Sequence, residues 1–314
     1  MRKGRTVDAK RILLFRTVAR CGSMSSAARQ LRLTQSAVSQ QLRLLEREAG
    51  SPLLVRSTRG IDLTEAGVLL LRRADAISGE LSMATEELAS LANLHAGKVR
   101  LIAFPSAASS VVPVAIQRLR RRAPGIEVRF VEAEPPAAKA AIQAGEAEIA
   151  IVFDYDDVPA DELALESESL GVESMFLVHS QESAPDDRPI AQEWLSEQDW
   201  IAGCQDCRQH LVERCRSAGF VPRVMHESDD YVVLQSLVAH GLGVAVLPRL
   251  ALTTFRHPSV EARLAGDFGE RTVSAVYRPG AEQVPATRAL LEQLKAATSL
   301  ALREPLRPGA PRAR

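Results

Sequence analysis

The apolar positions of residues 24–50 recur at helical spacing and predict two short helices joined by a tight turn. The second helix carries its apolar stripe at i, i+4, i+7 and i+11, on Val38, Leu42, Leu45 and Ala49. The inner face of the first helix is compact and is made by Ala27, Ala28 and Leu31. The pattern therefore predicts a closely packed helix pair whose apolar sides face each other.

Capping residues set the expected limits of this pair. Ser25 is expected to cap the first helix, and Thr34 to cap the second through its hydroxyl. Between the helices, residues 32–34 are expected to form the turn, with Leu33 buried.

The face opposite the apolar stripe carries side chains that can donate hydrogen bonds to base edges and phosphates: Gln35, Ser36, Ser39, Gln40 and Arg43. The following loop adds Arg56 and Arg59. A small helix pair, a polar recognition face and a basic loop are together typical of a winged helix-turn-helix. We therefore expect Gln35, Ser36, Ser39 and Arg43 to enter the major groove, and the two loop arginines to contact the backbone or minor groove. The expected DNA-binding set is completed by Ser25, Thr34 and Gln40.

A long helical pattern without proline follows, from Thr64 to about Leu94. Its apolar residues recur with heptad spacing, on Ala74, Leu81 and Leu88 at one position and on Leu70, Ile77, Ala84 and Leu91 at the other. The helix would be a rod of roughly 45 Å, and Gly97 is expected to cap its end. Dimerisation through the stripe is the preferred interpretation. The alternative is a helix that packs on its own domain.

From residue 98 onward, strand patterns alternate with helix patterns, which predicts an α/β domain with parallel sheets. Strands are expected over residues 98–104, 126–133, 148–153, 172–180, 199–203, 221–227, 243–248 and 271–278, and the last helix over 285–302. The tail at 304–314 is rich in Pro and Arg and is expected to be disordered.

The segment from Asp8 to Gly67 resembles the DNA-binding domain of LysR-type transcriptional regulators. The matching motifs are Ala27-Ala28, Thr34-Gln35-Ser36-Ala37-Val38-Ser39, Leu45-Glu46, and Pro52-Leu53-Leu54-Val55-Arg56 with Leu63-Thr64-Glu65-Ala66-Gly67. Three positions depart from the family pattern. Gln40 and Leu44 replace basic residues, which removes charge near DNA, and Leu54 replaces a phenylalanine in the core of the wing.

The rest of the chain is similar to the effector-binding domain of the same family. The motifs that carry this likeness are Gly-Leu-Gly-Val-Ala-Val-Leu-Pro at residues 241–248 and Ala-Gly-Glu-Ala-Glu-Ile-Ala-Ile at 144–151, with Glu148 where the family has Asp. The resemblance implies two α/β subdomains of the type 2 periplasmic-binding-protein kind, with a small-molecule effector between them. The expected domains are the winged helix-turn-helix at 7–66, the linker and dimerisation helix at 64–96, and the effector domain at 98–303, with subdomain I at about 98–168 and 267–303 and subdomain II at about 169–266.

Ligands of such domains bind where strands end and helices begin. The resemblance places Ser106 and the adjacent Ala107 where an effector carboxylate is often bound, and it gives cleft-lining positions to Phe153, Gly203, Gln205 and Asp230. Three of these residues also have a structural interpretation: Ser106 as a helix cap, Phe153 as a core side chain, and Gly203 as part of a tight turn. Gly241 and Gly243 are interpreted as structural residues that permit close packing of helix on strand.

Composition and charge support this division of the chain. A length of 314 residues with 46% apolar residues is sufficient for two domains with proper cores. Residues 1–66 contain 13 Lys and Arg against 5 Asp and Glu, a formal charge of +8, so the remaining 248 residues carry −8. A basic N-terminal fifth with an acidic remainder indicates that nucleic-acid contact is confined to the N-terminus.

Four cysteines, Cys21, Cys204, Cys207 and Cys215, are too few for a disulfide framework. Ordinary thiols are the first interpretation of the last three. The alternative is a redox-sensing regulator of the same family that uses Cys204 with Cys207 or Cys215, since some relatives sense oxidants through a cysteine pair in this region. A zinc site that includes His210 is the weakest idea, because the second ligand pair that makes such motifs specific is missing.

The sequence argues against several other classes of protein. It has no G-x-S-x-G, Walker, dinucleotide or HExxH motif, and the adjacent carboxylates at 156–157 and 229–230 are typical of solvated loops. We therefore expect no enzyme, no cofactor and no bound metal. No apolar run reaches the roughly 18 residues that span a bilayer, and no apolar stretch follows the basic N-terminus as in a secretory signal. The expectation is a cytoplasmic regulator, a homodimer or homotetramer, whose partners are double-stranded DNA and a small-molecule effector.

Overall fold

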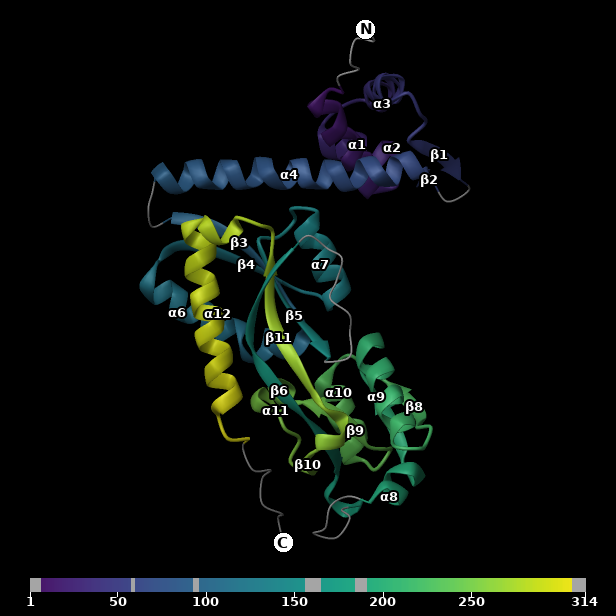
Figure 1. The fold of residues 1–314 in the computed structure, drawn as a ribbon, viewed down its shortest axis with the longest axis vertical. Helices are drawn as coiled ribbons and strands as arrows, with labels where there is room; N and C mark the ends of the chain where they lie inside the picture. Colours follow the sequence, from purple (N-terminus) through teal and green to yellow (C-terminus); the bar gives the residue numbers. More distant parts are fainter. Residues whose placement is uncertain (1–6, 58–59, 93–95, 156–164, 184–190, 307–314) are drawn as a thin grey trace. The chain divides into compact units, whose positions relative to one another are not determined.

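The computed structural model describes residues 7–57, 60–92, 96–155, 165–183 and 191–306. The chain divides into two compact units (Figure 1). The first comprises residues 1–85 with 143–146, and the second comprises 86–142 with 147–314. Of the described residues, no helix is both long enough and apolar enough to cross a membrane.

The first unit is a small helical domain with a β-hairpin. Its elements are α1 (Ala9–Cys21), α2 (Met24–Leu31), α3 (Gln35–Ala49), β1 (Leu54–Ser57), β2 (Gly60–Leu63) and the first part of α4 (Glu65–Ala92). Its core contains Phe15, Val18, Ala27, Val38, Leu42 and Leu45, all with at most 3% of their surface exposed. The predicted helix pair is confirmed, and the basic loop after it contains the antiparallel hairpin β1–β2.

The structure corrects three details of the helix pair. Ser23, not Ser25, caps α2, because the helix begins at Met24 and the Ser23 side chain accepts a hydrogen bond from the Ser26 amide. Leu33 is 45% exposed rather than buried. Its amide bonds to the Ala28 carbonyl while Arg32 adopts a left-handed φ of 55°, and the turn leaves the Leu33 side chain in solvent. Ala49 is exposed, so the buried stripe of α3 ends at Leu45.

Helix α4 is about 42 Å long, and its heptad stripe is buried along one part and exposed along another. Ala74 is fully buried in the core of the first unit, with Leu70 and Ile77 packed beside it. Asp75 attaches the helix to α1, because its carboxylate accepts from Arg16 Nε at 2.7 Å and from Arg20 Nη2 at 2.9 Å. This part of the helix therefore packs on its own domain.

Farther along α4, Leu81 is 52% exposed and Ala84 is also exposed. The side chains of the last two predicted heptad residues, Leu88 and Leu91, lie outside the described set. The described part of the stripe is thus split into a buried half and an exposed half. Gly97 was predicted to cap the end of this helix, and that prediction is wrong. It lies in a strand, and a Cβ there would come within 2.7 Å of the Ala286 Cβ, so its absence permits close packing of that strand on the last helix.

The second unit is an α/β structure. Its strands are β3 (Ala96–Ala103), β4 (Gly125–Glu132), β5 (Ile149–Tyr155), β6 (Glu166–Ser180), β7 (Asp199–Ala202), β8 (Arg223–Glu227), β9 (Ala245–Pro248), β10 (Val260–Leu264) and β11 (Glu270–Tyr277). Its helices are α5 (Pro105–Ser110), α6 (Val112–Arg122), α7 (Pro135–Gln143), α8 (Gln192–Glu197), α9 (Gln205–Ser217), α10 (Tyr231–Ala239), α11 (Arg249–Thr254) and α12 (Pro285–Arg303).

Among the described residues, seven strands form one sheet in the order β10-β6-β11-β5-β3-β4, with β9 also paired to β6, and β7 pairs separately with β8. The prediction of parallel sheets holds for β3 with β4 and β5, and for β7 with β8. It is wrong for β6 and β11, which run antiparallel to their neighbours. Strands β10 and β11 both pair with the long strand β6, β10 with its residues 176–180 and β11 with its residues 166–174, and both pairings are antiparallel.

Two hydrophobic clusters lie within this unit. One packs α7 on β3, β5 and β11 through Ile102, Ile142, Ala150 and Val276. The other surrounds the second half of β6 with residues of α10, β9 and β10, including Phe176, Leu234, Ala245 and Val260. Helices α6 and α12 pack together, away from α7 (Figure 1).

Gly241 and Gly243 are required for different structural reasons. A Cβ at Gly243 would come within 2.7 Å of the Asp199 carbonyl oxygen, so close packing excludes a side chain there, as predicted. Gly241 has open space around it and is required by its left-handed φ of 71° instead. Glu148, the departure from the family's Asp, is buried and accepts from the Arg100 amide at 2.6 Å and from Arg100 Nε at 3.1 Å.

Candidate nucleic-acid interface and effector site

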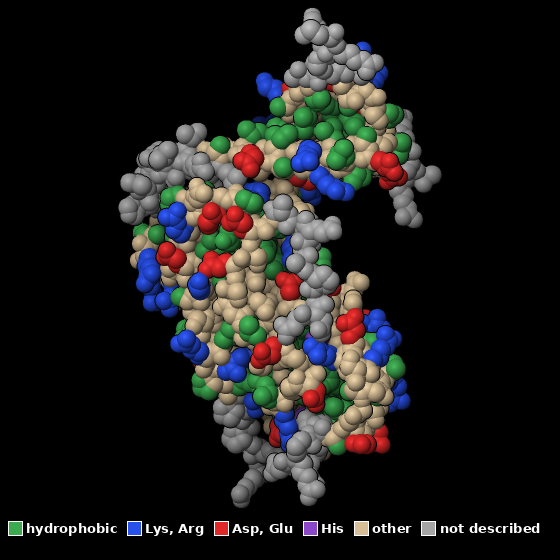
Figure 2. All heavy atoms as spheres, in the orientation of Figure 1, with side chains coloured by type: hydrophobic (Ala, Val, Ile, Leu, Met, Phe, Trp, Pro, Cys, Tyr) green, Lys and Arg blue, Asp and Glu red, His purple; other side chains and the backbone are tan. Residues whose placement is uncertain are grey.

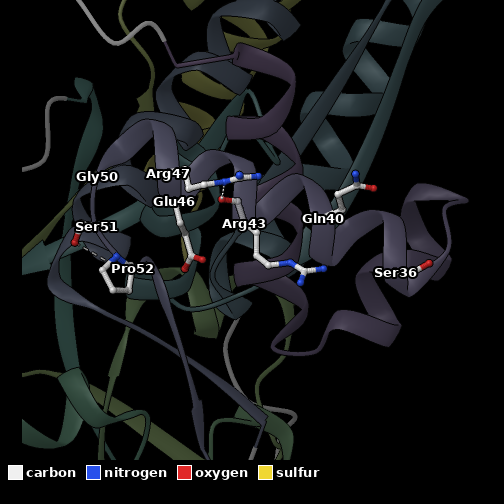
Figure 3. Close-up of a pocket in the computed structure, with 8 residues that line it drawn as sticks. All are labelled: Ser36, Gln40, Arg43, Glu46, Arg47, Gly50, Ser51 and Pro52. Atoms are coloured by element: carbon white, nitrogen blue, oxygen red, sulfur yellow. Dashed lines mark hydrogen bonds between the residues drawn. The ribbon is translucent and has the colours of Figure 1, made fainter. Parts of the chain in front are cut away.

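The outer face of α3 presents a row of polar side chains to solvent. Gln35, Ser36, Gln40 and Arg43 are exposed and Ser39 is half-buried, while the opposite side of the helix is in the core. An open surface hollow borders this face, with Ser36, Gln40 and Arg43 along it (Figure 3). The predicted recognition residues therefore lie together and are accessible.

Side-chain contacts order the start of this face. Thr34 caps α3 as predicted, because its hydroxyl accepts from the Ala37 amide at 3.2 Å. The same hydroxyl lies 3.0 Å from the Ser36 hydroxyl. Ser25 reaches across from α2 and donates to Gln35 Oε1 at 3.4 Å. Two helices thus contribute to one hydrogen-bonding surface.

The structure adds residues that the sequence reasoning missed. Arg47 is exposed one turn after Arg43 and lines the same hollow (Figure 3). Glu46, which also borders the hollow, accepts from the Leu53 amide at 2.9 Å and so attaches the loop after α3. The helical spacing of Arg43 and Arg47 was visible in the sequence and was a usable signal. The side chain of Arg56, which lies in β1, and all of Arg59 are outside the described residues.

A second group of polar side chains is buried in the α/β unit, around Ser106 and Arg271. Both residues are 0% exposed. Arg271 Nη2 donates to Ser106 Oγ at 2.8 Å, and Arg271 Nε donates to Glu173 Oε1 at 2.7 Å. Phe104 precedes α5 as its N-cap residue, so Ser106 is not a helix cap, and its hydroxyl serves the arginine.

The sheet register explains why these groups meet. Arg271 of β11 is paired with Tyr155 on β5 and with Glu173 on β6, so the three side chains form a row across three strands. Glu173 also accepts from the Leu250 amide at 2.8 Å through its second oxygen. The row therefore connects α5, through Ser106, with α11, through Leu250.

Aromatic rings enclose the guanidinium. Its Cζ lies 4.1 Å from the ring centre of Phe153 and 4.9 Å from that of Phe104, within the range of cation–π attraction. The two rings meet edge to face at 5.0 Å, and Tyr155 stacks on His210 at 3.7 Å. Phe153 is thus both a buried residue, as the alternative proposed, and a wall of the polar cluster.

Burial and charge control the pKa values in this group. Burial raises the pKa of Tyr155 well above its ordinary value, and the Cys207 charge adds to this. Burial also raises the pKa of Glu134, and the Asp229 carboxylate acts in the same direction. The pKa of Tyr231 is raised by burial, against the opposing effects of Arg271 and the Ser106 hydroxyl. At neutral pH both tyrosines keep their O–H donors.

Two thiols border the same group. The Sγ atoms of Cys204 and Cys207 are 2.9 Å apart, at the N-terminus of α9. Their hydrogen bond lowers the pKa of Cys207 and raises that of Cys204. Cys215 is buried, which raises its pKa to about 12. His210 Nε2 is 2.7 Å from the Phe268 carbonyl oxygen, and among the described residues no group of three or more His, Cys, Asp or Glu could hold a metal ion.

The remaining predicted effector residues occupy the edges of this region. Ala107 is fully buried beside Ser106, and Gly203 is half-buried at a place where an added Cβ would meet the Cys207 Cβ at 3.5 Å. Gln205 is exposed at the start of α9. Asp230 is exposed and caps α10, accepting from the Val232 amide at 2.8 Å. Its side chain therefore acts within its own helix.

Arg271 and Glu173 were missed from the sequence, although each lies at the start of a segment that was predicted as a strand, 271–278 and 172–180. Opposite charges inside two apolar strands were a signal for a buried ion pair. On the visible surface of the α/β unit, by contrast, acidic and basic side chains are interspersed (Figure 2). A single-sign surface suited to DNA is therefore not evident on that face.

Comparisons with known proteins agree with this geometry. The family described as bacterial regulatory helix-turn-helix protein, lysR family, matches residues 9–68, and the LysR substrate binding domain matches residues 92–299. The chain is 30% identical over 297 residues to a probable HTH-type transcriptional regulator, LrrA, of Synechococcus elongatus. The match covers 92% of this chain and 97% of the relative. The chain is also 28% identical to the nitrogen assimilation regulatory protein nac of Escherichia coli, over 78% of this chain and 79% of that protein.

Solved structures share the fold. Full-length CbnR in complex with its target DNA matches with a TM-score of 0.61 at 19% identity, covering 93% of this chain and 100% of that one. A full-length OxyR variant from Pseudomonas aeruginosa matches with a TM-score of 0.67 at 20% identity, over 95% and 97% of the two chains.

Proposed function

This chain belongs to the LysR family of transcriptional regulators, and we propose that α3 reads its operator while the cluster around Arg271 binds its effector. At the level of the family, the protein is a sequence-specific DNA-binding regulator that responds to a small-molecule effector and acts as an oligomer. Which residues perform these tasks in this chain is the substance of the proposal.

The exposed polar face of α3 is the observation that carries the DNA-binding part. We assign Gln35, Ser36 and Ser39 to base edges in the major groove, with Ser25 orienting Gln35. Arg43 and Arg47 reach bases or phosphates from the next turns of the helix. Arg56 and Arg59 stay assigned to the wing on sequence grounds. We propose residues 7–66 as the winged domain and 64–96 as the linker helix.

The buried Ser106–Arg271–Glu173 network carries the effector part. We place subdomain I at about 98–168 and 267–303 and subdomain II at about 169–266. The polar row on β5, β6 and β11 would then lie where the chain crosses between the two subdomains. An effector at this row would bias the arrangement of the subdomains, and so the spacing of the paired DNA-binding domains. Exposed Leu81 and Ala84 of α4 are the proposed contact with a second copy.

This role requires recognition of the effector and no chemical conversion of it, so we propose that the protein is not an enzyme. Access to promoter DNA supports a cytoplasmic location.

The test of the DNA-binding assignment is binding to the duplex upstream of the protein's own reading frame, measured by fluorescence anisotropy against a random duplex. We expect tighter binding to the promoter. Arg47→Ala is expected to weaken binding to both duplexes alike and to reduce the slope of log K against log salt by about 1, because a lost phosphate contact releases about one counterion fewer. Arg129→Ala, a change to an exposed arginine of the α/β unit, serves as the control and should leave both unchanged. Equal affinity of the wild type for the two duplexes would contradict the assignment.

A second candidate, redox sensing, is favoured by one observation, the 2.9 Å separation of Cys204 Sγ and Cys207 Sγ. In such a switch, hydrogen peroxide would be reduced to two water molecules as the two thiols lose their hydrogens and form one disulfide. We expect peroxide to produce this disulfide, detected as a mass loss of two hydrogens in the peptide that holds both residues. Cys204→Ser should prevent it, and Cys215→Ser should not. If the oxidised protein binds its promoter as the reduced one does, the pair is not a switch.

A further inference from the structure

We propose that Glu46 is a positioning residue for DNA binding, whose carboxylate fixes the β1–β2 hairpin, the wing of the domain, relative to the recognition helix α3. This inference rests on the function proposed above, in which α3 reads the operator and the arginines of the wing contact DNA. It adds the side chain that holds these two DNA-contacting elements together.

Two residues, Pro52 and Leu53, form a strap between α3 and the base of the wing. The Leu53 amide donates to Glu46 Oε1 at 2.9 Å. The next residue, Leu54, begins β1 and pairs with Leu63, which closes the hairpin. Leu53 is only 1% exposed, so its amide would be a buried donor without an acceptor if the Glu46 oxygen were removed. The Glu46 carboxylate therefore ties the base of the wing to α3.

The other side of the strap is held by the start of α4. The Thr64 amide donates to the Leu53 carbonyl at 3.1 Å, and the Thr64 hydroxyl donates to the Pro52 carbonyl at 2.8 Å. The same hydroxyl accepts from the Gly67 amide at 3.0 Å. A Cβ at Gly67 would come within 2.1 Å of the Leu53 carbonyl oxygen, so α4 lies directly against the strap. The strap is thus joined to α4 by Thr64 and to α3 by Glu46.

The position of Glu46 on α3 would disfavour DNA binding if the side chain had no other task. Glu46 follows Arg43 by three residues and precedes Arg47, and all three border the open hollow beside the recognition face (Figure 3). DNA phosphates attract the two arginines and repel a carboxylate there. A side chain whose charge opposes binding, but whose oxygen accepts from the amide at the base of the wing, is explained by positioning and not by contact with DNA.

The experiment compares Glu46→Gln with Glu46→Ala in the full chain, by fluorescence anisotropy with the promoter duplex over a series of salt concentrations. Both variants remove the charge, but glutamine retains an oxygen for the Leu53 amide. We expect Glu46→Gln to keep the wild-type slope of log K against log salt. Glu46→Ala is expected to bind about tenfold more weakly than Glu46→Gln, with a slope lower by about 1–2, because Arg56 and Arg59 no longer reach phosphates while α3 is bound. Equal slopes in the two variants would overturn the inference.

Glu48→Ala is the matched control. Glu48 also lies on α3, and its partners are the Arg11 side chain and the Asp8 amide, away from the strap. The change removes one negative charge and a contact of α3, as Glu46→Ala does, so it should keep the wild-type slope. If it lowers the slope as much as Glu46→Ala does, the cause is a general loosening of α3 and Glu46 has no positioning role.

Arg56→Ala shows whether the wing and Glu46 act as one unit. In the Glu46→Gln background we expect it to lower the slope by about 1. In the Glu46→Ala background we expect little further change, since the wing no longer holds Arg56 against DNA, and the two effects are then not additive. The same effect in both backgrounds, whether a reduction or none, would show that Glu46 does not position Arg56.

Thermal unfolding of each variant identifies any that is not folded at the assay temperature. Thr64→Ser and Thr64→Val make the same comparison from the other end of the strap, because serine keeps the hydroxyl that donates to the Pro52 carbonyl and valine does not. We expect the slope to fall in Thr64→Val alone, and equal slopes would contradict the proposed role of the strap. A wild type that prefers its promoter, with equal slopes in the Glu46 variants, would refute the positioning role and leave the proposed DNA binding standing. Equal wild-type affinity for promoter and random duplex would refute both.

Discussion

Arg271→Met is expected to lower the free energy of unfolding of the α/β unit by about 3–5 kcal/mol, the usual cost of leaving one charge of a fully buried pair without its partner. Both Arg271 and Glu173 have completely buried side chains. Among the described residues, the substitution would leave the Glu173 carboxylate with the Leu250 amide as its remaining donor and would remove the donor to Ser106. Urea unfolding, followed by fluorescence of Trp194 and Trp200 in this unit, measures the effect.

Two further variants show whether the charge is the cause. The double variant Arg271→Met with Glu173→Gln removes both charges and retains an oxygen for the Leu250 amide, so most of the lost stability should return. Arg129→Met breaks an exposed pair with Glu127 and should cost less than about 1 kcal/mol. If the double variant is as unstable as the single one, the loss arises from packing on Phe104 and Phe153 rather than from the unpaired carboxylate.

Gln35→Ala is expected to cost about 1–3 kcal/mol at one base pair of the operator, the value of a bidentate contact between an amide side chain and a base edge. The first residue of α3 lies where recognition helices of this motif meet bases, and its amide oxygen is already oriented by Ser25. A library of operator duplexes with single base-pair changes, titrated against wild type and variant, would reveal the position that loses discrimination.

Gln30→Ala is the matched control, since Gln30 is exposed on α2, outside the recognition face. It should change neither affinity nor sequence preference. An intact preference in Gln35→Ala would mean that α3 is rotated about its axis relative to the proposed orientation. The bases would then be read from the side that carries Gln40 and Arg43.

Local periodicity was sufficient to predict the helical domain, because the apolar stripe and the cap that define it lie within a few turns of the chain. The stripe of Val38, Leu42 and Leu45 and the cap at Thr34 follow from spacing and side-chain chemistry alone. The errors occurred at the ends, where capping geometry decides. A shift of two residues in the cap separates Ser23 from Ser25, and the left-handed Arg32 turns Leu33 into solvent.

The effector cluster was less accessible from the sequence, because it depends on strand pairing over long separations. Ser106 was identified by resemblance, but its partner Arg271 is 165 residues away, and Glu173 is 98 residues from Arg271. Nothing in the local pattern of β6 or β11 states that these strands run antiparallel and side by side. The alternation of strands and helices predicted the class of the fold and left that register undetermined.

The attachment of α4 to α1 has a mechanical meaning. Ala74 is locked into the core, and Asp75 is tied to two arginines of α1, which itself packs on α3. Over this length α4 is therefore held to the same core as α3 by direct packing and by two ion pairs of the buried Asp75. If α3 binds DNA as proposed, we expect a rotation of α4 beyond Ile77 to be transmitted to α3 without a hinge between them.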